Sequence, residues 1–280
     1  MITIAIPVYN RLDFLNIMAK SLSNIDMPLP CNIRIYDDKS TDFDISDLKK
    51  LFPNAASINR NKVNFKADKN MYFFYKDFLS TQDEYLFNAD SDIIFNKNCL
   101  TQALDFLKQT DGVLSLFNAT SHPVKEVYNN DLCIKETIGA AGTFFIRKRV
   151  KEIIDSFSGL EDKNQIKSFD WKWSNYLINN NIRIFCTNNS LIQHIGYYGQ
   201  NTLIPYRGYR SIKIQKPYYD YGRNFKIDSI ETGQIINDIF EKLVDQNRME
   251  DEKVIRLLSK KITFKIINLF KLIKIKLLKI

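Results

Sequence analysis

The sequence has few of the residues that build the commonest catalytic and binding motifs. Its 280 residues include only four cysteines, nine glycines and two histidines. The cysteines are far apart and form no Cys-x-x-Cys pair, so we expect buried, reduced thiols and neither a zinc site nor a disulfide framework. The Gly-x-x-x-x-Gly-Lys-Ser/Thr loop of P-loop NTPases is absent. No apolar run reaches about 18 residues, and Met1 leads directly into an apolar strand, so we expect neither a membrane span nor a signal peptide.

Acidic residues are missing from the C-terminal segment 253–280, which carries nine Lys and Arg. The net charge of +8 therefore belongs to this segment, because residues 1–252 contain 31 Lys and Arg against 32 Asp and Glu. A nearly neutral body argues against nucleic-acid binding, which requires a basic face.

The same segment has the pattern of an amphipathic helix. At 100° per residue, eight of its apolar side chains fall in an arc of about 100° that only Ser259 interrupts, and every cation lies outside that arc. This pattern is typical of a helix lying on an anionic membrane surface, so we expect a cytoplasmic protein held peripherally on the inner face of the cell membrane. A core-packing or oligomerising helix is the alternative, although it would usually carry acids on its wet face. The apolar arc comprises Ile255, Ile262, Ile266, Leu269, Phe270, Ile273, Leu277 and Ile280.

Apolar runs alternate with segments of helical period through the first 200 residues. Such alternation predicts an α/β fold with a mostly parallel sheet flanked by helices. Residues 118–138 show no clear period and are expected to be irregular. We expect three parts: a domain over 1–202, an extension packed on it over 203–252, and the amphipathic helix over 253–280. The predicted strands are 2–8, 32–36, 55–59, 84–90, 112–117, 139–146 and 181–186, and the predicted helices are 12–22, 43–52, 100–107 and 150–157, with others ending near 78 and starting near 168.

Two carboxylates, Asp90 and Asp92, stand at the end of the apolar run 84–89. Aspartate is a poor strand residue and is rarely buried unless it is paired, so this strand is expected to end at a pocket. Carboxylates at this spacing can hold a hard divalent cation together with a ligand phosphate. A turn that happens to contain two aspartates is the structural alternative.

Four motifs occur in an order that resembles the family 2 inverting glycosyltransferases with the GT-A fold, a Rossmann-like fold of nucleotide-diphospho-sugar transferases. They are the opening strand and turn Ile2–Asn10, the acidic turn in Ile35–Asp42, the cationic loop Asn59–Asn70, and Asn88-Ala-Asp-Ser-Asp92. The resemblance covers roughly residues 1–200. It implies transfer of a sugar from a nucleoside-diphosphate donor, a UDP-sugar above all, to a glycan or lipid-linked acceptor of a bacterial surface polysaccharide.

The resemblance also assigns roles to individual residues. A Mn²⁺ or Mg²⁺ ion would be held by Asp90 and Asp92, with His194 completing the site, and Asp170 would be the base that deprotonates the acceptor. Gly142, Trp171 and Trp173 would lie on the acceptor side. The residues expected to bind the nucleotide sugar are Pro7, Tyr9, Asn10, Arg11, Asp37, Asp38, Arg60, Lys66, Asn70, Asp90 and Ser91.

Each of these roles has a structural alternative. Asp170 could be an ordinary helix N-cap, and the family's usual acid before it is Phe169 here. His194 could be a satisfied structural histidine, the pair at 37 and 38 could form a turn, and the tryptophans could belong to the core. His122, on the irregular segment, is expected at the surface or the acceptor site.

Three other functions compete with glycosyl transfer. A sugar-nucleotide nucleotidyltransferase would open with a Gly-rich phosphate loop, and residues 1–15 contain no glycine. A phosphoryl hydrolase would carry its Asp-x-Asp on the first strand. An inert membrane-docked scaffold would not need Asp90, Asp92, Asp170 and His194 together. Whatever its function, the chain could also form a homo-oligomer.

Overall fold

The computed structural model describes residues 1–159, 166, 168–196, 203–205, 215–217, 222–226, 228, 232–239 and 241–242. The chain divides into two compact units, Met1–Ile195 with Asp220–Thr232, and Gly196–Tyr219 with Gly233–Ile280. The predicted helix over 253–280 lies outside the described residues, as does most of the predicted extension over 203–252. Within the second unit, β12 (Leu203–Pro205) pairs antiparallel with β13 (Gln215–Pro217).

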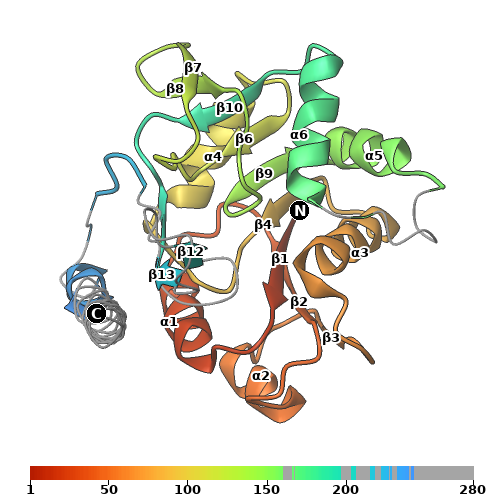
Figure 1. Ribbon diagram of the computed structural model, residues 1–280, viewed down its shortest axis with the longest axis vertical. Helices are drawn as coiled ribbons and strands as arrows, with labels where there is room; N and C mark the ends of the chain where they lie inside the picture. Colours follow the sequence, from red (N-terminus) through yellow and green to blue (C-terminus); the bar gives the residue numbers. More distant parts are fainter. Residues whose placement is uncertain are drawn as a thin grey trace, which may run out of the picture. The chain divides into compact units, whose positions relative to one another are not determined.

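The first unit is built on a nine-stranded mixed sheet in the order β3-β2-β1-β4-β9-β6-β10-β8-β7 (Figure 1). The β3-β2-β1-β4 half is parallel, as predicted, and β6 and β10 are also parallel. The four other pairings are antiparallel. The strands are β1 (Ile2–Val8), β2 (Cys31–Asp37), β3 (Ser57–Arg60), β4 (Tyr85–Asn88), β6 (Val113–Ser115), β7 (Val124–Val127), β8 (Leu132–Lys135), β9 (Thr143–Ile146) and β10 (Ile184–Thr187).

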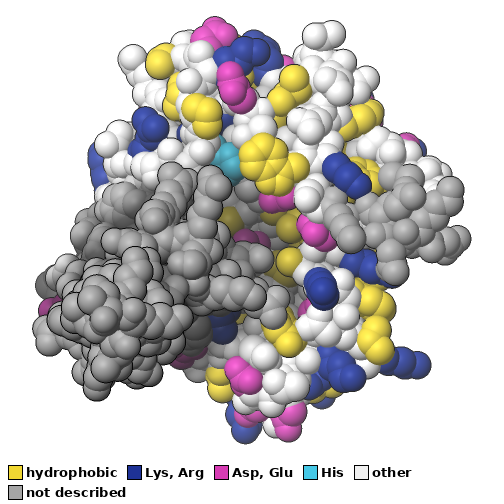
Figure 2. Space-filling view, viewed as in Figure 1, with side chains coloured by type: hydrophobic (Ala, Val, Ile, Leu, Met, Phe, Trp, Pro, Cys, Tyr) yellow, Lys and Arg dark blue, Asp and Glu magenta, His cyan; other side chains and the backbone are white. Residues whose placement is uncertain are grey.

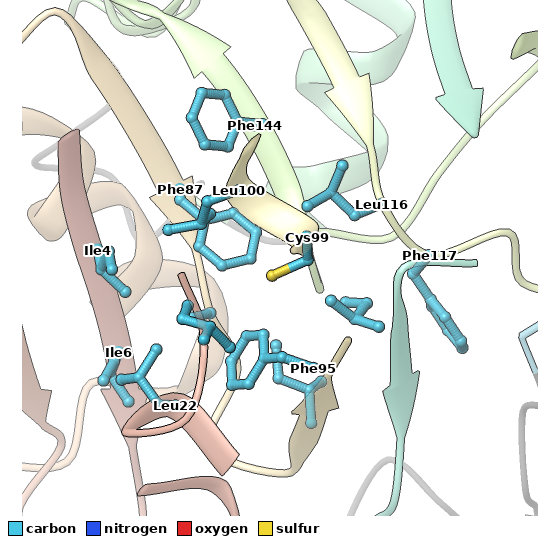
Figure 3. Packing of buried hydrophobic residues seen from close by; sticks show 14 of the residues in the cluster. Ile4, Ile6, Leu22, Phe87, Phe95, Cys99, Leu100, Leu116, Phe117 and Phe144 are labelled. Atoms are coloured by element: carbon cyan, nitrogen blue, oxygen red, sulfur yellow. The ribbon is translucent and has the colours of Figure 1, made fainter. Parts of the chain in front are cut away.

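Helices cover both faces of this sheet, because alternate residues of each strand point to opposite sides. Ile4, Phe87 and Phe144 pack with α1 (Leu12–Leu22), α2 (Ile45–Leu51) and α4 (Cys99–Leu107) in one core, part of which Figure 3 shows. Their neighbours Leu86 and Phe145 pack on the other face. The helices there are α3 (Lys66–Ser80), α5 (Arg147–Ser156) and α6 (Phe169–Asn179). The sheet is therefore the middle of three layers.

Two features differ from the prediction. The segment 118–138 is not irregular throughout but contains the hairpin β7–β8. It was missed because β7 is an edge strand with mostly exposed side chains, so it lacks an apolar alternation. No strand was predicted beyond residue 186, yet His194 ends β11 (Ile192–His194), which pairs antiparallel with β5 (Ile93–Phe95). Among the described residues, no helix is long and apolar enough to cross a membrane.

Candidate active site

The predicted site residues gather where β1 and β4 separate. Strand β1 pairs with β2 up to Val8 and Asp37, whereas its pairing with β4 ends at Asn88. The chain then turns through Asp90-Ser91-Asp92 into β5, and the Ala89 amide donates to the Ala5 carbonyl at 2.9 Å. Carboxyl ends of parallel strands, at a point where neighbouring chains diverge, are the usual ligand site of such sheets. Figure 2 shows acidic side chains in a hollow on one face of the molecule.

The turns that follow β1 and β2 are joined to each other by side-chain hydrogen bonds. Asn10 and Arg11 both adopt positive φ angles, of 54° and 59°, which redirect the chain sharply between β1 and α1. The Asn10 amide donates to the Ser40 hydroxyl at 2.8 Å, and the Asn10 side-chain carbonyl accepts from the Thr41 amide at 2.7 Å. Asn10 therefore fixes the β1 turn against the β2 turn.

Asp37 and Asp38 are both buried, and each carboxylate accepts hydrogen bonds from the protein. Asp37 accepts from the amide and the hydroxyl of Ser40, at 2.9 and 2.6 Å. Asp38 accepts from the backbone amides of Phe65 and Lys66, both at 2.7 Å, and so holds the cationic loop in place. The turn-forming role that the sequence left open is thus present, and a contact of either carboxylate with ribose or base stays a prediction.

The remaining predicted donor residues surround these two turns. Arg60 lies 3.3 Å from the Asp37 carboxylate and donates to the carbonyls of Phe43 and Ser40. Asn70 is buried, and its side-chain amide donates to the Tyr36 carbonyl at 3.0 Å. Pro7, Lys66 and Tyr9 contribute no side-chain hydrogen bond or ion pair that the structure describes in the site. Pro7 pairs with Tyr36 along β2, the Lys66 side chain is exposed, and Tyr9 is 40% exposed at the end of β1.

Asp92 is the electrostatic centre of the site. Its Oδ2 lies 2.8 Å from Nη1 of Arg11 and 3.3 Å from Nε2 of His194. His194 reaches it because the β5–β11 register places it opposite Ile93, and because the Ile195 amide donates to the Asp92 carbonyl at 2.8 Å. Burial alone would raise the pKa of Asp92, but His194 and then Arg11 outweigh it and hold that pKa far below its usual range. Burial would lower the pKa of His194, and Asp92 reverses this, so the net shift is upward.

Asp90 behaves in the opposite way, although it is only two residues away. Burial, reinforced by the charge of Asp92, raises the pKa of Asp90 to about 7. Its Oδ1 accepts from the Asn88 side chain at 3.3 Å, and Asn88 also donates to the Ala140 carbonyl at 2.7 Å. Asn88 was not among the predicted residues, although its place at the end of an apolar run was a usable signal. Ser91 is buried between the two aspartates.

Asp170 lies in the first turn of α6, close enough to the Asp-x-Asp segment for its charge to help raise the pKa of Asp90. Burial, and to a lesser degree Asp68, raises the pKa of Asp170 itself. Asp170 is not the N-cap, because that position is Ser168, whose side chain makes no capping bond. Asp68 instead accepts from the amides of Ser168 and Phe169, at 2.9 and 2.8 Å, and fixes the start of the helix.

The three predicted acceptor-side residues have different surroundings. Gly142 has a φ of 68°, and a Cβ there would lie 2.0 Å from Cδ1 of Ile192, so only glycine fits this turn. Trp171 is 51% exposed and can contact a ligand. The prediction for Trp173 is wrong, because its side chain is 0% exposed and packs edge-on against Phe145 in the core.

The donor set of Asp90, Asp92 and His194 suits a hard or borderline divalent cation, which accepts carboxylate oxygen and imidazole nitrogen. The buried Nδ1 of His194 has no hydrogen-bond partner among the described residues, so this ring is not fully satisfied by the protein alone. The side chains are not preorganised around an ion, since Asp92 is paired with Arg11. In the described part of the chain, no cluster of three His, Cys, Asp or Glu converges on one point. The residues fit a metal by donor chemistry, and its binding would require Asp92 to exchange partners.

Tyr75, which lies on α3 beside this site, was not predicted from the sequence. Its side chain is fully buried, and its hydroxyl has no partner among the described residues. Burial raises the pKa of Tyr75, and the charges of Asp90 and Asp170 raise it further, so both carboxylates are close to this hydroxyl.

The chain matches the family described as glycosyl transferase family 2 over residues 3–163. A solved structure of S. aureus TarS is 14% identical, with a TM-score of 0.50 over 92% of this chain and 42% of that one, which shows a shared fold. TarS 1-349 in complex with UDP is 18% identical, with a TM-score of 0.49 over 68% of this chain and 57% of that one. Mannosyltransferase PcManGT from Pyrobaculum calidifontis, in complex with GDP-Man and Mn²⁺, is 13% identical, with a TM-score of 0.49 over 74% of this chain and 58% of that one.

The chain thus spans between 42% and 58% of the length of these three structures. A comparison with curated proteins returned no match.

Proposed function

This chain belongs to glycosyl transferase family 2 and is a glycosyltransferase, and we propose that it transfers a sugar, with inversion, from a UDP-sugar to a glycan or lipid-linked acceptor. The observation that carries this proposal is the pairing of Asp92 with both Arg11 and His194 at the carboxyl edge of the parallel strands, with Asp90 and Asp170 nearby. An inert scaffold would have no reason to gather a buried aspartate, a second aspartate, a histidine and an arginine in one partly buried place, because removing charges from water is costly.

On the donor side, the chain supplies ligands and fixed positive charge. Asp90, Asp92 and His194 would hold a divalent cation, Mn²⁺ or Mg²⁺, which when bound neutralises the charge that develops on the departing diphosphate. Arg11 adds a guanidinium beside the same carboxylate, 2.8 Å from Asp92. The β2 turn and the cationic loop, held together by Asp38, form the wall expected to bind ribose and base.

On the acceptor side, Asp170 is the proposed base. An inverting transfer requires a base that removes the proton of the attacking hydroxyl as the new bond forms. Burial raises the pKa of Asp170, which makes its carboxylate a stronger base than an exposed aspartate. The Trp171 amide donates to Asp170 Oδ1 at 2.8 Å, so this oxygen is held by the helix end.

The predicted basic helix over 253–280 would hold the enzyme at the cytoplasmic face of a membrane, where lipid-linked acceptors are extended. Its cationic, acid-free composition supports this proposal. The acceptor would then belong to a surface polysaccharide.

The decisive experiment measures Mn²⁺-dependent cleavage of UDP-, GDP- and dTDP-sugars by the full chain. We expect turnover with one UDP-sugar, loss on chelation with EDTA and recovery with Mn²⁺. Asp92→Ala should lower kcat by about 10³-fold, since metal stabilisation of the leaving group is worth several kcal/mol. Ser46→Ala, on the exposed start of α2, is the control. No cleavage of any donor, with no Mn²⁺-dependent nucleotide binding, would leave the inert scaffold as the better interpretation.

A further inference from the structure

Trp171 is exposed at a position where the helix could have carried a polar residue. Helix α6 buries Phe169 and Trp173, which lie one turn apart on the face toward the sheet, and Trp171 between them points away from that face. Its side chain is 51% exposed, directly after the candidate base Asp170. A single exposed aromatic has no special meaning in itself, so a ligand role needs further observations.

A second aromatic ring lies beside Trp171. The His122 imidazole lies with its centroid 6.1 Å from that of Trp171, at an interplanar angle of 46°. Together the two rings form an open aromatic corner, which we call the His122–Trp171 corner.

The loop that presents His122 is held by a buried cation. Lys135 is only 2% exposed, and its ammonium donates to the carbonyls of Ala119 and His122, at 3.2 and 2.5 Å. Burying an ammonium is costly unless its hydrogen bonds are made, so these two bonds set the loop firmly in place. His122 Nδ1 also lies 3.1 Å from the Thr137 hydroxyl, which fixes the ring.

The corner adjoins the turn that leads to the donor carboxylates. A Cβ on Gly139 would lie 3.8 Å from Nε2 of His122, so this nitrogen faces the backbone of the glycine turn. The next carbonyl, that of Ala140, accepts from Asn88, which also donates to Asp90. The corner is therefore connected to Asp90 through one short turn and to Asp170 by a peptide bond.

We propose that the His122–Trp171 corner binds a neutral pyranose ring of the acceptor glycan. The apolar C–H face of the sugar would pack on the exposed indole, and the imidazole of His122 would lie along the edge of the sugar ring. This arrangement would bring a hydroxyl of the same sugar toward Asp170. The inference rests on the proposed function and deepens it, because it gives the acceptor a sugar, and not a lipid or a protein, at the point of transfer.

The test separates acceptor binding from donor chemistry. For Trp171→Ala we expect the acceptor KM to rise about tenfold, while the donor KM and the slow hydrolysis of the donor by water stay unchanged. Trp171→Phe should recover part of the affinity, because a phenyl face remains. Ile178→Ala, which removes a 39% exposed apolar side chain from the same helix, is the control and should change neither KM.

A second measurement does not depend on turnover. Trp171 is exposed and Trp173 is buried, so methyl hexopyranosides should protect only the Trp171 fluorescence from iodide quenching, and His122→Ala should weaken that protection. Unchanged acceptor KM in Trp171→Ala, together with donor hydrolysis, would overturn the inference and leave the proposed function intact. Protection by pyranosides without any donor turnover would support sugar binding at the corner and overturn the proposed glycosyl transfer.

Discussion

Replacing Tyr75 with phenylalanine should stabilise this protein, although tyrosine-to-phenylalanine changes in a core usually do the opposite. Tyr75 is 0% exposed, and its ring packs edge-on against Phe145 and Phe169, with centroids 5.6 and 5.3 Å apart. Those ring contacts survive the change. The hydroxyl is different, because it has no hydrogen-bond partner among the described residues.

The size of the effect follows from the cost of an unsatisfied buried group. Leaving such a hydroxyl without a partner costs about 1–3 kcal/mol, which the phenylalanine variant no longer incurs. A net gain of about 1 kcal/mol would raise Tm by roughly 2–4 °C in a protein of this size. The hydroxyl is fully buried, so neither substrate can contact it, and the donor KM should stay unchanged.

Tyr72 provides a matched control on the same helix. It is equally buried, and it also packs edge-on against Phe169, at 5.8 Å, but its hydroxyl is not among the unsatisfied buried groups. Tyr72→Phe should therefore lower stability by about 1 kcal/mol. Both variants are measured by thermal and urea unfolding. A Tyr75→Phe variant that loses as much stability as Tyr72→Phe would refute the reasoning, because its hydroxyl would then have a partner.

Four further predictions concern proton binding, the glycine turn and the tail. Because the pKa of Asp90 is raised to about 7 and that of His194 is raised, Mn²⁺ affinity by calorimetry should increase from pH 6 to pH 8, and Asp90→Asn should flatten this dependence. In metal-free protein the folded state keeps the Asp90 proton that the unfolded state releases above about pH 4, so Tm should fall as pH rises toward 7. The fall should be smaller in Asp90→Asn, where only the raised pKa values of His194 and Asp170 contribute to it. Gly142→Ala should cost more than about 2 kcal/mol in urea unfolding, through positive φ and the clash with Ile192, and a smaller loss would refute it. Deleting 253–280 should abolish flotation with anionic vesicles, and retained flotation would remove the membrane role from the tail.

Apolar runs and helical periods in the sequence predicted those strands and helices that depend mainly on their own residues. Strand β1 (Ile2–Val8) and helix α1 (Leu12–Leu22) have the predicted bounds, because an unbroken apolar run and a clean helical period leave few alternatives. The hairpin β7–β8 and the short pair β5–β11 were missed. The strands β5 and β11 have three residues each, and their structure is decided by pairing between distant segments, which no local pattern records. The hairpin was missed for a different reason, because β7 is an exposed edge strand without apolar alternation.

In the candidate site, too, some features could be predicted from local sequence and others depend on contacts made only in the folded chain. The Asp-x-Asp segment at the end of β4 could be predicted, because an acid after a buried run indicates a strand end at a pocket. The resemblance grouped His194 with Asp92, and the structure places them 3.3 Å apart. The pairs Arg11–Asp92 and His122–Trp171 were not predicted, since each joins residues far apart in the sequence. Tyr75 was hidden for a related reason: a tyrosine at an apolar helix position looks the same whether its hydroxyl has a partner or not.

The chain contains two acidic pairs that look alike in sequence and differ in chemistry. Asp37 and Asp38 accept hydrogen bonds from neighbouring amides and hydroxyls, so their charge is used to hold two turns and a loop. Asp90 and Asp92 accept few bonds from amides. Their charge is opposed by Arg11 and His194, both of which a cation or a substrate can replace. Backbone partners cannot leave, whereas side-chain counter-ions can. The second pair is therefore the one able to exchange partners during a reaction, and this difference, which only the folded chain reveals, favours Asp90 and Asp92 as the reactive pair.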